Sequence, residues 1–286
     1  MRERLAVSDS LHELVAVLTL PDLEVMQQSR VSFVPGRLCA GQRLYCADVS
    51  APTIHTLNPE TLAEEGVLAA APELEALCLS ENALYIYALS GGADSLQKLE
   101  CAQGRLLHVA RVGVRPSGFA QDAQGRCLVV AGGAAAEVTV LESATLGVCA
   151  SYPVGGAASD ACFFAGQLMV LCASGDYEMR TLVGAIGPDG QWKPWAALNG
   201  LPGAMAPCGG GLLVGHMRTL TMLDPPNGRI RWQTKIAGLP TAIVPVGRAA
   251  CFADGLDGLV GLIDLRRGTV LRRMRLGEPG GLAVMG

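Results

Sequence analysis

The sequence predicts an all-β fold, a seven-bladed β-propeller with four strands in each blade. Three observations predict it: an apolar position recurs about every 40 residues, apolar and polar residues alternate within the repeats, and there is almost no helix signal. The spacings between successive apolar positions are 39, 42, 42, 45, 37 and 40 residues. The positions are Leu18, Leu57, Leu99, Leu141, Ile186, Leu223 and Ile263. Seven recurrences of one strand-rich unit predict seven blades.

The first unit lacks an innermost strand of its own. The chain opens at residues 4–9 with RLAVSD, which matches the second strands of later units, such as RLYCAD at residues 43–48. It closes with GGLAVM, which matches an innermost strand with nothing after it. We therefore expect blade 1 to combine residues 1–31 with residues 280–286, so that residues 1–286 form a single closed domain. Closing the ring removes two sheet edges that would otherwise invite aggregation.

The second unit shows the order of elements that every unit repeats. Four strands are expected at residues 37–40, 43–48, 53–58 and 62–68. A Gly41-Gln42 turn, a loop through Pro52 and a Pro59-Glu60 turn separate them. In the next three units, paired glycines such as Gly91-Gly92 and Gly132-Gly133 are also interpreted as turns.

The sixth unit has the clearest pattern. Its strands are expected at residues 204–207, 212–216, 219–224 and 229–236, and residues 219–222 alternate between threonine and an apolar residue. This period of two is typical of a strand with one buried face. Turns are expected at Gly209–Gly211, Met217-Arg218 and Pro225–Gly228.

The seventh unit carries the one basic cluster that the sequence shows. The cluster consists of Arg266, Arg267, Arg272, Arg273 and Arg275. It is interpreted either as the solvated face of an outer strand and turn or as a docking patch for an acidic partner.

Composition and charge narrow the possible partners. Half of the residues are hydrophobic, and 22 basic residues face 26 acidic ones, giving a net charge of −4. A weakly acidic chain with 5% aromatic residues is not expected to bind nucleic acid. No apolar stretch reaches the roughly 18 residues of a membrane span, and the first 15 residues lack the apolar core of a signal peptide. We expect a cytoplasmic protein whose partner is a small molecule or another protein.

The ten cysteines are expected to be structural thiols. Eight of them fall on predicted first or second strands, and no CxxC pair suggests a zinc ribbon or a redox pair. Unpaired cysteines on strands behave as small hydrophobic residues, and a secreted protein with ten of them would be at risk of oxidation. Cysteine usage therefore agrees with the cytoplasmic expectation.

The repeated motif resembles YVTN-type and lactonase-like seven-bladed propellers. The segments that carry the resemblance are VLTLPDLEV, HTLNPETLAEE, TVLESATLGV, TMLDPPNGRIRW and GLIDLRRGTVLRR. Leu223–Trp232 is also similar to the blade motif of quinoprotein-like propellers, in which a tryptophan packs between blades. Only one of the seven units has this tryptophan, so a pyrroloquinoline quinone site is not expected. The resemblance covers nearly the whole chain and implies the fold far more strongly than any chemistry.

The residues that end the second strands are the candidate site. In blade order they are Asp9, Asp48, Ser90, Gly132, Ser174, His216 and Asp254. Because the ring closes, blades six, seven, one and two are consecutive, which places the histidine and the three aspartates on one arc of the channel mouth.

This arc allows two interpretations. Asp9, Asp48 and Asp254 could bind a divalent cation such as calcium or magnesium, with His216 as a candidate catalytic base and His12 joining from the adjacent loop. Alternatively, side chains at strand ends commonly cap the following turn, and such caps would recur at equivalent positions. His55 and His108 are expected in outer strands without a functional role.

Two functions remain open from the sequence. The first is a non-catalytic propeller that binds a small ligand or a protein partner at the channel mouth. The alternative is a metal-assisted hydrolase or lyase acting on a lactone or similar cyclic ester, with the cation polarising the carbonyl and a carboxylate or His216 acting as base. The sequence contains no GxSxG or HExxH motif and no glycine-rich loop opening a helix.

Overall fold

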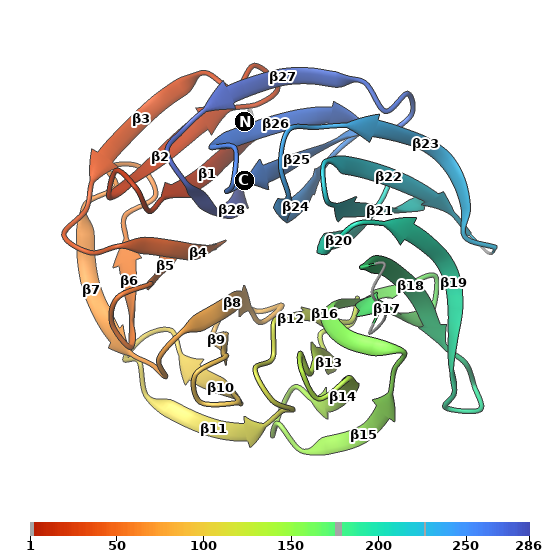
Figure 1. The fold of residues 1–286 in the computed structure, drawn as a ribbon. Coiled ribbons are helices and arrows are strands. Elements are labelled where there is room, and N and C mark those ends of the chain that lie inside the picture. The colour runs from red at the N-terminus through yellow and green to blue at the C-terminus, as the bar shows by residue number, and fades with distance from the viewer. Residues whose placement is uncertain (1–2, 175–178, 226) are drawn as a thin grey trace.

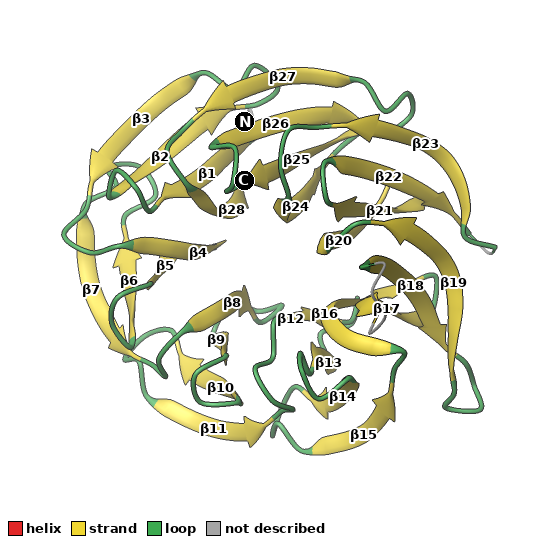
Figure 2. Cartoon of the chain, in the orientation of Figure 1, coloured by secondary structure: helices red, strands yellow, loops and turns green. Residues whose placement is uncertain are grey.

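The computed structural model confirms the predicted fold. It describes residues 3–174, 179–225 and 227–286. Seven antiparallel sheets of four strands each are arranged in a ring (Figure 1). Figure 2 shows only strands and loops in the described part of the chain. These residues form no helix of the length and apolarity that crossing a membrane requires.

Each blade runs from an innermost strand near the ring axis to an outermost strand at the rim. Blade 1 consists of β28 (Pro279–Met285), β1 (Arg4–Asp9), β2 (Leu14–Thr19) and β3 (Val25–Arg30). Blade 2 consists of β4 (Pro35–Ala40), β5 (Leu44–Asp48), β6 (Thr53–Leu57) and β7 (Glu64–Ala69). Blade 3 consists of β8 (Leu74–Leu79), β9 (Tyr85–Ser90), β10 (Ser95–Glu100) and β11 (Leu106–Arg111). Blade 4 consists of β12 (Gly118–Gln121), β13 (Cys127–Ala131), β14 (Glu137–Glu142) and β15 (Val148–Pro153).

The remaining three blades follow the same order. Blade 5 consists of β16 (Gly156–Phe164), β17 (Gln167–Ser174), β18 (Arg180–Ile186) and β19 (Trp192–Asn199). Blade 6 consists of β20 (Pro202–Cys208), β21 (Gly211–His216), β22 (Thr219–Asp224) and β23 (Arg229–Lys235). Blade 7 consists of β24 (Pro240–Val246), β25 (Ala249–Asp254), β26 (Leu259–Asp264) and β27 (Val270–Arg275). The expected strands of the second and sixth units agree with these bounds to within two residues, and Pro226 of the expected turn lies outside the described residues.

The recurring apolar position lies on the third strand of every blade. All seven residues are at most 8% exposed. In six blades the pairing between the third and fourth strands shifts register next to this residue. A bulge bends a strand and increases its twist. The period of about 40 residues therefore marks the point where the outermost strand bends over a buried anchor.

The C-terminal strand closes the ring, as the sequence predicts. β28 pairs antiparallel with β1, with Leu5 opposite Val284 and Val7 opposite Leu282. The hydroxyl of Ser8 accepts a hydrogen bond from Gly281 N at 2.8 Å and donates one to Gly36 O of blade 2 at 2.6 Å. Blade 1 is thus composite, with β28 at its inner edge, and β28 starts one residue earlier than expected.

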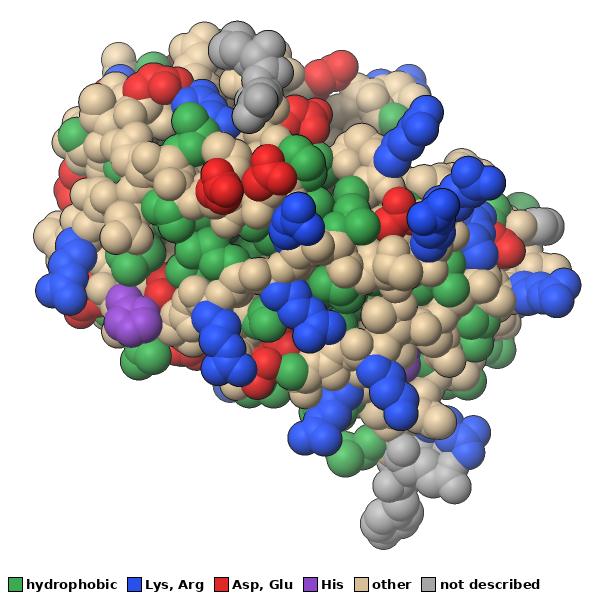
Figure 3. All heavy atoms as spheres, turned by 90° about the horizontal axis from the view of Figure 1, so that it is seen from above, with side chains coloured by type: hydrophobic (Ala, Val, Ile, Leu, Met, Phe, Trp, Pro, Cys, Tyr) green, Lys and Arg blue, Asp and Glu red, His purple; other side chains and the backbone are tan. Residues whose placement is uncertain are grey.

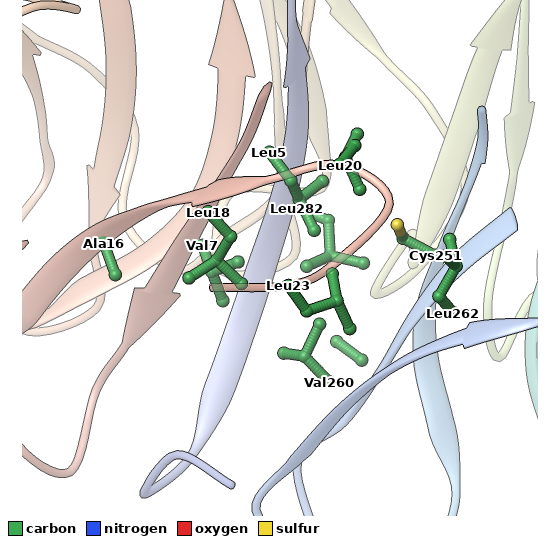
Figure 4. Packing of buried hydrophobic residues seen from close by; sticks show 11 residues of the cluster. Leu5, Val7, Ala16, Leu18, Leu20, Leu23, Cys251, Val260, Leu262 and Leu282 are labelled. Carbon is green, nitrogen blue, oxygen red and sulfur yellow. The ribbon is translucent and has the colours of Figure 1, made fainter. Parts of the chain in front are cut away.

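The hydrophobic core lies between neighbouring blades. Figure 4 shows Leu5, Val7 and Leu282 of blade 1 facing Cys251 and Val260 of blade 7. All ten cysteines are free thiols, and seven of them are buried. Burial raises the pKa of Cys251 to about 12, so at neutral pH this thiol is protonated and packs as an apolar side chain.

Candidate functional site

The innermost strands share an irregularity near their first residues. In six of the seven blades, the pairing between the innermost and second strands shifts register at this level. In blade 3, for example, Leu74 lies opposite Ser90 and Ala76 opposite Leu89, so Glu75 is the extra residue. Bulges of this kind re-aim side chains and are frequent beside binding sites.

The innermost strands of all seven blades line a central cavity of about 630 Å³. This volume is in the range of cavities that bind small molecules. Much of the wall is small or apolar, including Gly203, Ala204, Met205 and Phe119. Its polar side chains are Arg37, Glu75, Ser117, Gln121, Ser159, Asp160 and Thr241.

Asp160 is a partly exposed carboxyl on β16 at the register shift of blade 5. Its Oδ1 accepts a hydrogen bond from Ala161 N at 2.9 Å, and its Oδ2 accepts one from Met205 N of blade 6 at 2.8 Å. A Cβ at Gly118 would come within 2.7 Å of Oδ1, so glycine is needed for blade 4 to approach this carboxyl. Burial raises the pKa of Asp160 to about 6, while the two hydrogen bonds and the charge of Arg37 only partly oppose it. Asp160 therefore titrates close to neutral pH.

Arg37 is the cation of the cavity. Its Nη1 donates to Gly280 O of blade 1 at 3.0 Å and to Thr241 O of blade 7 at 3.4 Å. Its Nε and Nη2 have no hydrogen-bond partner in the described part of the chain. The guanidinium is thus held by two neighbouring blades and keeps donors for a bound molecule.

Glu75 is the second carboxyl of the cavity. Burial raises the pKa of Glu75, and the nearby charge of Arg37 acts in the opposite direction. No hydrogen bond to its carboxylate occurs among the described residues. Arg37, Glu75 and Asp160 come from three blades, and together they form one set of ionisable groups with unused hydrogen-bonding capacity.

The sequence-predicted aspartates occupy equivalent places just outside this cavity. Asp9, Asp48 and Asp254 end their second strands and pair with Pro279, Pro35 and Pro240, the first residues of the innermost strands. His216 pairs with Pro202 in the same way. Gly132 directly follows the last residue of β13. Its N–H donates to Glu137 O at 2.9 Å, across the turn that leads to β14.

Backbone N–H groups surround the carboxylates of Asp9 and Asp254. Asp254 accepts hydrogen bonds from Gly238 N, Leu239 N and Asp257 N at 2.6, 3.1 and 3.2 Å. Asp9 accepts from Gly277 N at 2.7 Å, from Glu278 N at 2.9 Å, and from both the N–H and the ring Nδ1 of His12 at 3.3 and 2.8 Å. Burial alone would raise the pKa of Asp9, but these hydrogen bonds together outweigh it and the pKa is lowered. Each carboxylate joins the loop before an innermost strand to the turn after a second strand.

The other predicted residues also have polar partners, Asp48 within its own blade and His216 partly across blades 5 and 6. Asp48 accepts from Ser50 N and Ser50 Oγ at 2.8 and 2.7 Å. His216 is 3% exposed, and its ring nitrogens contact Asn199 O and Thr221 Oγ1, both at 2.8 Å. Burial lowers its pKa, although the bond to Asn199 O opposes this, so the ring is neutral at pH 7.

These contacts favour turn capping over a metal site at the arc. No three His, Cys, Asp or Glu side chains lie close enough to share a metal ion within residues 3–174, 179–225 and 227–286. His55 stacks on Phe33 with ring centroids 3.6 Å apart, and His108 is exposed on β11. Both lie away from the cavity lining.

Sequence reasoning missed Arg37, Glu75 and Asp160. The sequence does contain a signal for these three residues, because each places a charge in an innermost strand. Other innermost strands carry glycine, alanine or threonine near the same place, as at Gly281, Ala204 and Thr241.

The comparisons with known proteins agree on the fold. No protein-family model and no curated protein matches the sequence. Among solved structures, a functionally unknown protein from Desulfotomaculum acetoxidans is 12% identical with a TM-score of 0.79, and 98% of each chain is covered. Hydrazine synthase from Kuenenia stuttgartiensis is 13% identical with a TM-score of 0.77, covering 87% of this chain and 89% of that one. A putative 6-phosphogluconolactonase from Bacteroides fragilis is 11% identical with a TM-score of 0.74, covering 100% of this chain and 98% of that one. At these identities the similarity establishes the propeller fold and no activity.

Proposed function

We propose that this propeller binds a small polar molecule in its central cavity without transforming it. The observation that carries the proposal is the set of Arg37, Glu75 and Asp160, which face one cavity of about 630 Å³ and are only partly hydrogen-bonded. Buried polar groups are normally satisfied, so unused donors and acceptors that converge on a cavity point to a ligand that completes them.

The three side chains define the chemistry of this ligand. The guanidinium requires a hydrogen-bond acceptor, such as a carboxylate or carbonyl oxygen, and the two carboxylates require donors, such as hydroxyl or ammonium groups. A compact hydroxy acid, sugar acid or amino acid offers both. The apolar wall at Phe119 and Met205 can cover the carbon skeleton.

Thermal unfolding in the presence of hydroxy acids, sugar acids, amino acids and lactones tests this proposal. A molecule that binds only the folded ring raises the melting temperature by mass action. Arg37→Gln and Asp160→Asn should each remove the shift produced by a hit, whereas Asp22→Asn, an exposed carboxyl outside the cavity, should keep it. Isothermal titration of each hit then gives the affinity. If Arg37→Gln and Asp160→Asn leave every hit's affinity unchanged, the ligand does not occupy this cavity.

Hydrolysis of a lactone is the second candidate function, and the pKa of Asp160 is the observation that favours it. A carboxyl with a pKa of about 6 is ionised at neutral pH yet basic enough to remove a proton from water. The water oxygen would add to the lactone carbonyl, the ring C–O bond would break, and the ring oxygen would take up a proton to give a hydroxy acid. Arg37 would stabilise the charge on the carbonyl oxygen. One solved neighbour is described as a putative 6-phosphogluconolactonase.

Acid release from gluconolactone at constant pH separates the two functions. A hydrolase should release acid faster than the buffer alone, and Asp160→Asn should slow the release by about 100-fold or more. Addition of a chelator tests whether a divalent cation takes part. If wild-type protein does not accelerate acid release but is stabilised by the compound, binding without turnover is the function.

A further inference from the structure

A second candidate site lies on the opposite face of the ring. A groove of about 530 Å³ runs between blades 6 and 7 and is lined by Arg231, Arg248, Arg266, Arg267, Asp264 and Leu265. Its walls are the turns that join first to second strands and third to fourth strands. In antiparallel blades these turns are at the end opposite to Asp9, Asp48 and Asp254, so the groove is separate from the cavity mouth.

The arginines of this groove carry charge that the protein does not neutralise. Arg231 is paired with Asp224, its Nε donating to Oδ1 at 2.6 Å. Arg248, Arg266 and Arg267 are exposed, and none of them forms an ion pair within the described part of the chain. Asp264 is the single acid in the lining, and its Oδ1 accepts the backbone N–H groups of Arg266 and Arg267 at 3.0 and 2.6 Å. This aspartate holds the turn in place and so presents the two arginine side chains to solvent.

The positive surface continues along the outermost strand of blade 7. Arg275 pairs with Leu259, which packs in the core between blades 6 and 7, and Arg273 lies two residues away on the same strand face. Arg273 and Arg275 therefore face the same side as the groove. From Val270 to Arg275 the strand spans roughly 17 Å at the rise of an extended strand, and Arg266 and Arg267 lie in the turn just before it.

The charge of this region is opposite to that of the whole chain. Residues 229–275 contain nine Lys or Arg and three Asp or Glu, a local net charge of +6 in a chain whose net charge is −4. One of the three acids, Asp254, is buried at the other face. Figure 3, which views the ring from above the rim that carries β27, shows many basic side chains on this side of the molecule, with acidic side chains among them. Such an asymmetry attracts anionic partners to one face of the molecule.

We propose that the groove and the strip along β27 form a docking surface for an acidic, extended segment of a partner protein. The cations are spread over roughly 17 Å of strand and the turn before it rather than converging on one point, which matches a chain of carboxylates and not a single phosphate group. The backbone of β27 is also unpaired on its outer side, as expected of an edge strand, so an extended segment can lie alongside it. The Trp232 Nε1 bond to Leu265 O at 3.0 Å fixes blade 6 against blade 7, so the groove is preformed.

Fluorescence anisotropy with a labelled oligoglutamate peptide tests the surface. Arg266→Glu/Arg267→Glu should weaken binding by at least about tenfold, since charge reversal replaces attraction by repulsion at both positions. Arg111→Glu/Arg126→Glu changes the net charge by the same amount on blades 3 and 4 and should leave the affinity within about twofold. Arg266→Gln/Arg267→Gln should give an intermediate loss, and all variants should unfold at the wild-type temperature because these side chains are exposed.

Three results would overturn the proposal. One is the absence of peptide binding by the wild-type protein at low ionic strength. Another is equal weakening by the two charge-reversed variants, which would indicate attraction to the overall charge only. The third is binding of a single-stranded oligonucleotide of equal charge as tightly as the peptide, because the surface would then not distinguish a protein segment from a nucleic acid.

Discussion

Asp9 and Asp160 are both carboxyls that accept hydrogen bonds from backbone N–H groups, but their pKa values shift in opposite directions. Asp9 accepts four hydrogen bonds, which together overcome burial and lower its pKa. Asp160 accepts two, and burial raises its pKa to about 6. Its four donors thus commit Asp9 to the structure, whereas Asp160 keeps acceptor capacity for a ligand.

The same contrast separates the residues that end the second strands from the residues that line the cavity. Capping side chains recur at equivalent positions, and at Asp9 and Asp254 they connect the end of a second strand to the loop before an innermost strand. The cavity residues do not recur, since each of Arg37, Glu75 and Asp160 occurs in one blade only. Recurrence in a repeat protein therefore identifies what the fold needs, and exceptions identify what a ligand needs.

Removing β28 should abolish both regions and have the largest effect. Deleting residues 280–286 exposes the inner edge of β1 and takes away the carbonyl of Gly280 that holds Arg37. We expect loss of the cooperative thermal transition, or aggregation, measured by calorimetry and gel filtration. A truncated protein that melts at the wild-type temperature would contradict ring closure by this strand.

Removing a cap should cost much more stability than removing a cavity carboxyl. Asp254→Ala leaves three N–H groups without their acceptor, which costs about 3 kcal/mol or more and lowers the melting temperature by roughly 6–10 °C. The loss should be the same with and without millimolar calcium or magnesium. A cation-dependent rise in the wild-type melting temperature that disappears in Asp254→Ala would instead restore the metal hypothesis for the arc.

The pH dependence of stability should distinguish the two carboxyls. The folded-state pKa of Asp160 is above its ordinary value of 3.8, so the native state binds more protons and the free energy of unfolding falls as the pH rises from about 4 to about 6, by on the order of 2 kcal/mol. For Asp9 the folded-state pKa is lowered, so its stabilisation is present above pH 4 and is lost as the pH falls below that value. Urea unfolding across this range measures both.

Asp160→Asn is the matching variant for that pH profile. It should flatten the slope between pH 4 and pH 6 and leave the acid limb unchanged, because Asp9 is untouched. An unaltered slope would show that Asp160 does not titrate in this window.

The smallest effect is expected at the exposed partner of Asp9. The side chain of His12 is 54% exposed, and its removal in His12→Ala leaves Gly277 N, Glu278 N and its own backbone N–H on the carboxylate. A loss of about 0.5 kcal/mol, or roughly 1–2 °C, is expected from thermal unfolding. Leu11→Ala in the same loop is the control, and a His12→Ala loss as large as that of Asp254→Ala would mean that the ring nitrogen is the main donor.

Most of the architecture could be predicted from the sequence, because strands and turns are local and the repeat offers seven examples of each. Even the pairing of β1 with β28 followed from the match of RLAVSD and GGLAVM to incomplete units. The site could not be predicted as well. The donors to Asp9 at Gly277 and Glu278 lie 268 and 269 residues away in the sequence. The bulges beside Arg37 and Glu75 arise from the pairing between the first and second strands, which a single stretch of sequence does not specify.

The pairing between β1 and β28 also governs the order of events during synthesis. Ser8 and Gly281, which hydrogen-bond across this pair, are 273 residues apart. At a translation rate of 5–20 residues per second, the inner edge of β1 waits roughly 14–55 s for its partner to leave the ribosome. A nascent chain stalled before residue 279 should remain open to protease at β1, and this sensitivity should disappear once β28 has emerged. One of the first strands to be made is therefore among the last to be protected.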